Sequence, residues 1–370
     1  MPTDTLIIGG GLSGLYLARG LARVNHHFLL IEARNRLGGR VLSQRPAQLA
    51  AVDSGARFDL GPAWIWPSMQ PLLSRLIDEL AIPVFPQFTA GAQLYEDADT
   101  STAQRHNSPS AHAQSYRVTG GAMTIIERLA ASLTPATVLL SEQAVRIRQH
   151  DAGVLVDLVD ARKNQRSIDA RRVVLALPPR LMQQLEFIPA LPDTLRTQWH
   201  NTPTWMAGHA KIIALYATPF WREQGLSGEV FSRRGPLSEI YDASPAAGGP
   251  YALFGFSGLS AERRRQLGLA EFSRSCLAQL QRLFGHQAAT PSEWLIKDWS
   301  EDEFTAAETD RIPLSQHPAY GSTPTDRSLW EGRLLLAGSE SATRSGGYLE
   351  GALEAAIEVL NRLADPENNT

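Results

Sequence analysis

The segment over residues 5–40 constrains the fold more than any other part of the chain, because it joins two apolar runs through a glycine-rich turn. The first apolar run covers residues 6–8 and leads directly into the sequence GGGLSG at positions 9–14. The second run covers residues 28–31 and ends at Glu32. This pattern predicts a strand, a tight turn, a helix over residues 12–23 and a second strand. Such a unit begins a Rossmann-like α/β domain.

Each glycine of this turn has a mechanical task. Gly9 permits the tight turn, Gly11 lets backbone N–H groups approach a pyrophosphate, and Gly14 lets the helix pack closely on the strand. The N-terminus of the helix, with its unpaired N–H groups, points at those phosphates. Glu32 lies 18 residues beyond Gly14 and can accept both ribose hydroxyls of an adenosine. The pattern predicts a dinucleotide site and leaves NAD and FAD both open.

The residues after Glu32 favour FAD. The sequence continues through Ala33 and Arg34 into RLGGR at positions 36–40, which resembles the extended fingerprint of FAD-dependent amine oxidases. Two glycines beside a guanidinium suit a second close approach of backbone to the dinucleotide. Arg40 is placed to neutralise the diphosphate charge.

Four separated segments resemble the monoamine and polyamine oxidase family in order and spacing. They are the N-terminal fingerprint, the KxxxxYxxPFW motif that starts at Lys211, the pair Asp298-Trp299, and AGSE…GGYLEGA from Ala337. The resemblance implies a Rossmann-like, glutathione-reductase-type FAD-binding domain with a second, α+β substrate-binding domain. We predict the FAD-binding domain over residues 1–70, 114–190 and 298–370, and the substrate-binding domain over 71–113 and 191–297.

Lys211, Trp299 and Tyr348 are the candidate catalytic residues. A lone lysine on an apolar strand is costly to bury without a partner, so Lys211 either reaches solvent or lies in a wet cavity. The resemblance favours the cavity, since the matching family lysine holds a water near flavin N5. Trp299 matches a family tryptophan near the flavin, and Tyr348 matches one wall of an aromatic cage around the amine. Each aromatic alone reads as an ordinary core residue.

The resemblance also assigns the wider site, without a metal. Expected substrate contacts are Trp64, Trp66, Trp205, Thr309 and Tyr348. Expected FAD contacts are Gly9, Gly11, Leu12, Ser13, Gly14, Glu32, Ala33, Arg34, Gly39, Arg40, Gly61, Pro62, Ala63, Trp64, Val145, Gly338, Ser339, Glu340, Tyr348 and Leu349.

Two departures from the family pattern refine the prediction. Counting forward from Trp299, the position of the flavin-linked cysteine of monoamine oxidases falls near Glu308, so we predict noncovalent FAD. The neighbouring cage tyrosine falls on Thr309. Either Trp64, Trp66 or Trp205 supplies the second wall, or the substrate needs no complete cage.

The turn at Gly61-Pro62 carries a third departure. Related L-amino-acid oxidases have an arginine two residues after this turn that clamps the substrate carboxylate, whereas Ala63 and Trp64 follow here. We therefore expect an amine without an α-carboxylate.

The composition of the chain indicates which classes of partner and which cellular compartment to expect. A net charge of −3 and a pI near 6.3 give no reason to expect nucleic acid or an anionic membrane. Cys276 is the only cysteine and has helically spaced apolar neighbours, so we expect a buried thiol and no intrachain disulfide. No apolar run approaches about 20 residues, and the first strand begins almost at once. We expect a cytoplasmic protein, with a homodimer left open.

The predicted function is oxidation of a small-molecule amine by hydride transfer to flavin N5, which gives an imine and then an aldehyde while O2 becomes H2O2. A desaturase or porphyrinogen-type oxidase that acts on C–C bonds is the alternative within this fold. A flavin-binding protein without amine turnover is the alternative from another class.

Overall fold

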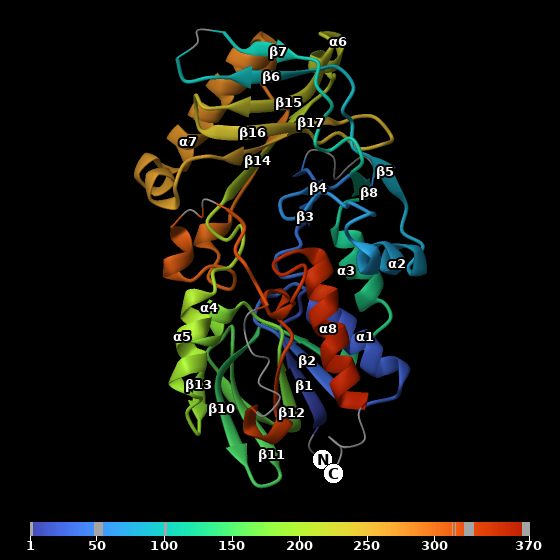
Figure 1. The fold of residues 1–370 in the computed structure, drawn as a ribbon, viewed down its shortest axis with the longest axis vertical. Coiled ribbons are helices and arrows are strands. Elements are labelled where there is room, and N and C mark those ends of the chain that lie inside the picture. The colour runs from blue at the N-terminus through green and yellow to red at the C-terminus, as the bar shows by residue number, and fades with distance from the viewer. Residues whose placement is uncertain are drawn as a thin grey trace.

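The computed structural model describes residues 3–47, 55–99, 102–312, 314, 316–321 and 329–364. Two large β-sheets lie toward opposite ends of its long axis, and helix α8 lies beside the first sheet in the lower half of Figure 1. The first sheet belongs to the predicted cofactor half, and the second belongs to the predicted substrate half. The predicted fold class is confirmed in both respects.

The first sheet has the order β13-β10-β11-β12-β1-β2-β9, with β19 paired to β12. Strands β1, β2, β12 and β19 run parallel, so their carboxyl ends meet at one edge. This edge brings together Gly9, Glu32 and Ala337 from distant parts of the sequence. The strands are β1 Thr3–Ile8, β2 Phe28–Glu32, β9 Val138–Leu140, β10 Glu142–His150, β11 Gly153–Asp160, β12 Gln165–Leu175, β13 Glu186–Ile188 and β19 Leu334–Leu336.

Helices cover both faces of this sheet. Ile7 packs into a core with helices α1, α3 and α8, whereas Leu6 and Ile8 pack on the opposite face with Trp199 of α5. Burial on both faces is what parallel strands require, and it explains why residues 6–8 form a continuous apolar run. The helices are α1 Leu12–Arg23, α3 Met123–Ala130, α4 Pro179–Met182, α5 Asp193–Asn201 and α8 Leu349–Ala364.

Two helices that the predicted division assigns to the substrate half pack against the first sheet instead. Leu73 and Leu76 of α2 (Pro71–Glu79) lie in the core that contains α1 and α8, and Trp199 places α5 on the opposite face. The domain boundaries therefore stay a prediction, with α2 and α5 as the segments that any revision would reassign.

The second sheet has the order β18-β14-β17-β16-β15-β6-β7. Helix α7 (Ala261–Phe284) covers one face, where Phe272, Cys276 and Leu280 are buried; the expected helix and buried thiol are confirmed. The other face packs on Phe58 and Leu60 of the cofactor half. The strands are β6 Ala92–Glu96, β7 Gln104–His106, β14 Ala210–Tyr216, β15 Leu226–Ser232, β16 Leu237–Asp242, β17 Tyr251–Ser257 and β18 Glu293–Asp298.

Strand β16 was not expected from the sequence. The sequence has strand-like runs at 229–232 and 251–257 and predicts a Gly/Pro-rich turn between them, whereas Leu237–Asp242 form a strand in the structure, so this prediction is wrong. The strand is short and lies between Gly235-Pro236 and Pro245, so the flanking turn residues mask its pattern.

Short elements complete the fold: β3 Ser43–Gln44, β4 Phe58–Asp59, β5 Val84–Pro86, β8 Tyr116–Val118 and α6 Phe220–Glu223. Short 3-10 turns join several of the longer elements. Among the residues that the structure describes, no helix has the length and apolar character needed to cross a bilayer.

Candidate active site

A cavity of about 570 Å³ extends from the carboxyl edge of the first sheet to the inner face of the second sheet. Most of the residues expected at the site line it. Those that do are Gly9, Gly11, Leu12, Ser13, Glu32, Ala33, Arg34, Gly39, Arg40, Gly61, Pro62, Ala63, Trp64, Trp66, Val145, Trp205, Lys211, Trp299, Gly338, Ser339, Tyr348 and Leu349.

Three expected residues do not line the cavity. Gly14 lies inside helix α1, where a Cβ atom would stand 2.0 Å from the Gly9 carbonyl oxygen. Glu340 lies behind Arg40 and accepts hydrogen bonds from its guanidinium at 2.6 and 3.1 Å. Thr309 lies in the turn Glu308–Arg311 and is not brought to the cavity. The sequence prediction placed Thr309 at the substrate only by counting residues from Trp299, and such a count does not show where the chain turns.

The nucleotide end of the cavity is built from backbone donors and one carboxylate. Glu32 is buried and accepts hydrogen bonds from the backbone N–H groups of Gly10 at 2.8 Å and Arg34 at 2.9 Å. The Oε2 atom, which accepts only the Gly10 bond within the described residues, keeps a lone pair for a further donor. Helix α1 begins after Gly11 without a side-chain cap, so its first N–H groups face the cavity unpaired by any cap.

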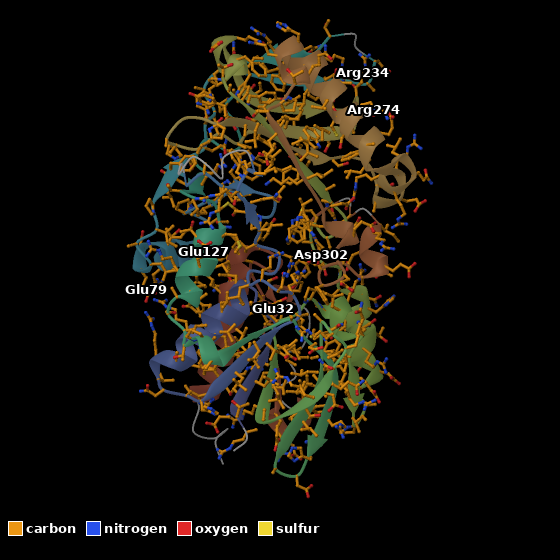
Figure 2. The ribbon with its side chains drawn as sticks, turned by 180° about the vertical axis from the view of Figure 1, so that it is seen from behind. Glu32, Glu79, Glu127, Arg234, Arg274 and Asp302 are labelled. Carbon is orange, nitrogen blue, oxygen red and sulfur yellow. The ribbon has the colours of Figure 1, made fainter. Side chains whose placement is uncertain are left out.

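Arg34 joins this end to the second half of the chain. Its guanidinium forms ion pairs with Glu32 and Asp302 and donates a hydrogen bond to Thr305 Oγ1 at 2.9 Å. Figure 2 places Glu32 and Asp302 near the middle of the molecule, between the two sheets. The cavity wall at this point depends on contacts across the chain.

Lys211 is fully enclosed where β14 faces the cavity. Its Nζ atom donates a hydrogen bond to the Gly61 carbonyl oxygen at 3.1 Å and stands 4.1 Å from the centre of the Phe254 ring. Burial lowers the pKa of Lys211 to about 7, although the nearby carboxylate of Asp59 opposes this shift. Lys211 therefore changes its charge near neutral pH, which is characteristic of functional sites.

Trp299 and Lys211 hold the same backbone segment. The indole N–H of Trp299 donates a hydrogen bond to the Leu60 carbonyl oxygen at 2.9 Å, and Lys211 donates to the next carbonyl, that of Gly61. These bonds fix the turn that precedes Pro62. The structure thus brings two of the three candidate catalytic side chains to one short stretch of backbone.

Tyr348 precedes helix α8 and is 42% exposed. The ring of His317 stacks on it at 4.6 Å with an interplanar angle of 4°, and Trp205 meets His317 edge-on at 4.9 Å. His317 was not expected at the site, because no sequence motif surrounds it. The aromatic neighbour of Tyr348 is thus a histidine, with Trp205 one ring further away.

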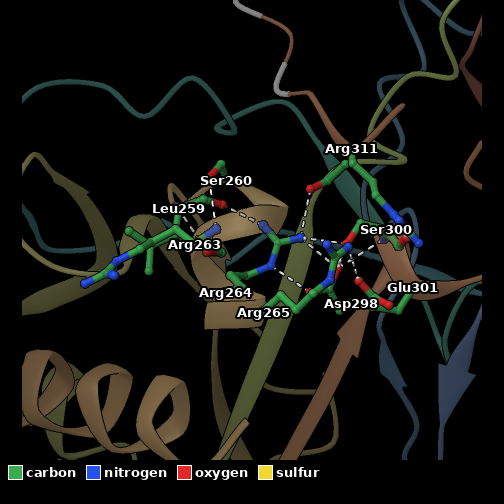
Figure 3. Close-up of polar contacts among 11 residues, drawn as sticks. Leu259, Ser260, Arg263, Arg264, Arg265, Asp298, Ser300, Glu301 and Arg311 are labelled. Atoms are coloured by element: carbon green, nitrogen blue, oxygen red, sulfur yellow. Dashed lines mark hydrogen bonds and ion pairs between the residues drawn. The ribbon is translucent and has the colours of Figure 1, made fainter. Parts of the chain in front are cut away.

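A buried arginine fixes the strand end that carries Trp299 (Figure 3). Arg264 donates two hydrogen bonds to the Asp298 carboxylate, both at 2.7 Å, and one to the Gly208 carbonyl at 2.9 Å. Burial alone would raise the pKa of Asp298, but the hydrogen bonds from Arg264 and Ser300 keep it below its usual value. One guanidinium therefore links the residue before Trp299 to the loop before β14.

Replacing Arg264 by leucine is expected to cost about 3 kcal/mol in the free energy of unfolding, because the Asp298 carboxylate is left partly buried without its cation. Among the residues that the structure describes, the neighbouring Arg265 pairs only with the exposed Glu262 and Glu301. Arg265→Leu is therefore the matched control and should cost less than about 1 kcal/mol. Urea unfolding at pH 7 measures both values.

The pH dependence of Arg264→Leu provides a second check. A depressed carboxyl pKa stabilises the fold above the unfolded pKa of Asp298 and loses that effect as the pH falls through the folded pKa. The difference between wild type and Arg264→Leu should therefore shrink in acid. A difference that stays constant with pH would contradict the proposed contribution of the Asp298 charge.

Comparison with known proteins assigns the family. A family model described as flavin containing amine oxidoreductase matches residues 94–363, and one described as an NAD(P)-binding Rossmann-like domain matches residues 7–80. The chain belongs to the flavin-containing amine oxidoreductases. This membership confirms the resemblance found in the sequence and implies a flavin cofactor.

Relatives of this amine oxidoreductase match it over nearly its whole length. A putrescine oxidase of Kocuria rosea is 25% identical, covering 96% of this chain and 95% of the relative. The flavin-containing amine oxidase B of Sus scrofa is 24% identical, covering 97% and 86%. A solved putrescine oxidase with bound putrescine has a TM-score of 0.80 at 20% identity, covering 98% of this chain and 99% of that chain. Cyclohexylamine oxidase of Brevibacterium oxydans has a TM-score of 0.78 at 21% identity, covering 99% and 100%.

Several cavity residues of this amine oxidoreductase were missed by the sequence analysis. The most informative are Ser238 and Glu239 of β16 and Phe256 of β17, which line the cavity beside Lys211. Ile240 and Tyr241, residue types that are enriched in strands, were a usable signal for β16. Its pairing with β17, however, depends on the fold and not on local sequence.

Proposed function

We propose that this protein is an amine oxidase that binds FAD noncovalently and oxidises the carbon next to the nitrogen of a primary or secondary amine. The products are an imine, which water hydrolyses to an aldehyde, and H2O2 from O2. The observation that carries this proposal is the enclosed Lys211, which shares one cavity with Trp299 and Tyr348 in a chain of the amine oxidoreductase family.

The residues at the nucleotide end fit FAD. A Cβ atom on Gly11 would meet nothing closer than the Gly38 carbonyl oxygen at 4.0 Å, so the space beside this backbone is open to a ligand. The uncapped start of α1 suits a diphosphate, and Glu32 suits the ribose hydroxyls. When bound, FAD supplies the hydride acceptor and passes the electrons to oxygen.

The cysteine content supports noncovalent binding. Cys276 is fully buried in the core beneath α7 and does not line the cavity. Burial raises the pKa of its thiol to about 12, so almost no thiolate is present at neutral pH.

The side chains at the substrate end have distinct proposed roles. Lys211 holds a water molecule through its Nζ atom and offers a positive charge to reduced oxygen species. Tyr348 and Trp205 present aromatic faces that orient the amine nitrogen, and the apolar walls favour the uncharged amine that has a free lone pair. A C–C desaturase would not require Lys211 or Tyr348, which is why the amine reaction is favoured.

Purified holoenzyme mixed with a panel of primary and secondary amines tests this proposal. We expect at least one amine to bleach the flavin absorbance without oxygen and to release one H2O2 per aldehyde in air. A yellow protein whose flavin no amine reduces would contradict the proposal and favour the C–C oxidase or the flavin-binding protein without turnover. Release of free FAD on acid precipitation would establish that the cofactor is noncovalent.

A further inference from the structure

A row of three side-chain positions crosses the second sheet from Lys211. Lys211 of β14 pairs with Phe256 of β17, and Phe256 pairs with Glu239 of β16. Adjacent strands lie about 4.8 Å apart, so the backbone of Glu239 is about 10 Å from that of Lys211. Lys211, Phe256 and Glu239 all line the cavity. A carboxylate therefore stands at a fixed distance from the proposed reaction centre.

A second carboxylate lies beside the first. Val230 of β15 pairs with Ile240 of β16, which sets Glu229 opposite Tyr241, and the Tyr241 hydroxyl donates a hydrogen bond to Glu239 Oε2 at 2.7 Å. Burial, and then the charge of Glu239, raise the pKa of Glu229. The two carboxylates thus act on each other electrostatically.

The described residues provide no cation for this pair. Glu229 is only 4% exposed, and its Oε1 atom has no hydrogen-bond partner within the described residues. A hydrogen bond from the Ser110 side chain to this carboxylate lowers the pKa of Glu229 and so opposes the effect of burial. Neither Glu229 nor Glu239 forms an ion pair with any lysine, arginine or histidine in the part of the chain that the structure describes. Enclosing carboxylates without a cation costs free energy, and a bound cationic ligand would remove that cost.

Trp64 and Phe256 line the cavity between its two ends, and further aromatic rings support them from behind. Trp64 packs against Tyr241, Phe254 and Phe256 with ring centres 4.9, 5.1 and 6.3 Å apart. Tyr241, Phe254 and Phe256 lie on the same face of the sheet as Lys211 and Glu239. An unbranched hydrocarbon chain can lie along this wall, whereas a charged group in its middle would find no partner there.

We propose that Glu239, with the buried Glu229 behind it, binds the second, charged nitrogen of a diamine, so that a diamine is the preferred substrate class. This inference rests on the proposed amine oxidation and adds its specificity. The reacting amine lies uncharged beside Lys211 and the aromatic rings, and the methylenes lie along Trp64 and Phe256. The distal ammonium pairs with Glu239, and the charge of Glu229 behind it adds to the attraction. The amine that reacts and the amine that anchors are thus distinguished by the charge of their surroundings.

The test compares 1,4-diaminobutane with n-pentylamine, a monoamine of similar length that carries a methyl group in place of the distal ammonium. Wild-type holoenzyme should have the higher kcat/KM with the diamine. In Glu239→Gln the ratio of the two kcat/KM values should fall about 100-fold, mainly through the KM of the diamine. Glu229→Gln, which changes a carboxylate behind the cavity wall, should lower the ratio in the same direction by a smaller factor. Glu262→Gln on the exposed surface of α7 is the matched control and should keep the wild-type ratio.

A binding measurement provides a readout that does not depend on turnover. Pentyltrimethylammonium has one fixed charge for the carboxylate end, an apolar tail for the end beside Lys211 and no nitrogen lone pair, so it should raise the Tm of the wild-type holoenzyme and not that of Glu239→Gln. Both glutamine substitutions remove a negative charge that no cation of the described residues balances, so neither variant should unfold at a lower temperature than wild type.

The outcomes separate this inference from the proposed function. If n-pentylamine reduces the flavin and the diamine has no advantage, or if both variants lower both kcat/KM values equally, the diamine site is wrong and the amine oxidase proposal stands. If neither compound nor any other amine reduces the flavin, the amine oxidase proposal itself fails.

Discussion

Lys211→Met holoenzyme is expected to keep its FAD and to react with oxygen about 100-fold more slowly than wild type. The ammonium group is the positive charge that the structure encloses beside Gly61, and methionine fills a similar volume without charge or donor. Stabilisation of negative charge in an enclosed site is worth far more than in water, because solvent screening is weak there. Stopped-flow mixing of reduced enzyme with oxygen measures the rate directly.

Lys163→Met is the matched control for this substitution, since Lys163 is exposed in the turn between β11 and β12. It should leave the oxygen reaction at the wild-type rate. An unchanged oxygen rate in Lys211→Met, with FAD still bound, would remove Lys211 from the proposed role.

The stability of the two proteins offers an independent check on the burial of Lys211. Its folded pKa of about 7 lies below the usual value of 10.5, so between these values the unfolded chain binds more protons and wild-type stability rises with pH. Methionine has no titrating group, so the stability of the variant does not change with pH in this way. Without cofactor, the variant should have the higher Tm. The difference in Tm should be largest below pH 7 and should disappear as the pH approaches 10.5.

Gly14→Ala is expected to abolish FAD retention and to destabilise the fold by several kcal/mol. The added Cβ atom would stand 2.0 Å from the Gly9 carbonyl oxygen, a backbone atom that cannot move without displacing the turn between β1 and α1. Flavin content after purification and urea unfolding of the soluble protein measure the two effects.

Gly11→Ala separates cofactor binding from folding. Gly11 has a φ of −76°, which alanine adopts freely, and its Cβ would meet only the Gly38 carbonyl at 4.0 Å. The cofactor-free variant should therefore unfold like wild type, whereas its affinity for FAD should fall because the methyl group projects into the cavity. Equal flavin content in Gly11→Ala and wild type would contradict the assignment of this turn to the diphosphate.

Much of the cofactor half could be predicted because its signals are local. The turn after β1 needs glycine for steric reasons, and an apolar strand buried on both faces leaves a continuous apolar run. The positions of Lys211 and Trp299 came from motifs whose order along the chain matches the family. The structure then shows both side chains holding adjacent carbonyls, a relation that no motif contains.

The substrate half was less predictable because its arrangement depends on pairing between distant strands. Glu239 reaches the cavity through the register of β16 against β17, and β16 itself is bounded by turn residues that obscure it. His317 meets Tyr348 through the path of a loop. Thr309 was expected at the substrate and does not line the cavity. Counting residues from Trp299 assumed a chain path that the turn at Glu308–Arg311 does not follow.

The bond from Lys211 to the Gly61 carbonyl has a consequence for how the site responds to alkali. A neutral amine still carries two N–H donors, so loss of the proton does not break this bond. The Lys211 side chain can therefore lose its positive charge without leaving its position. Activity lost by raising the pH should return at once on reversal, with no rearrangement of the chain to wait for.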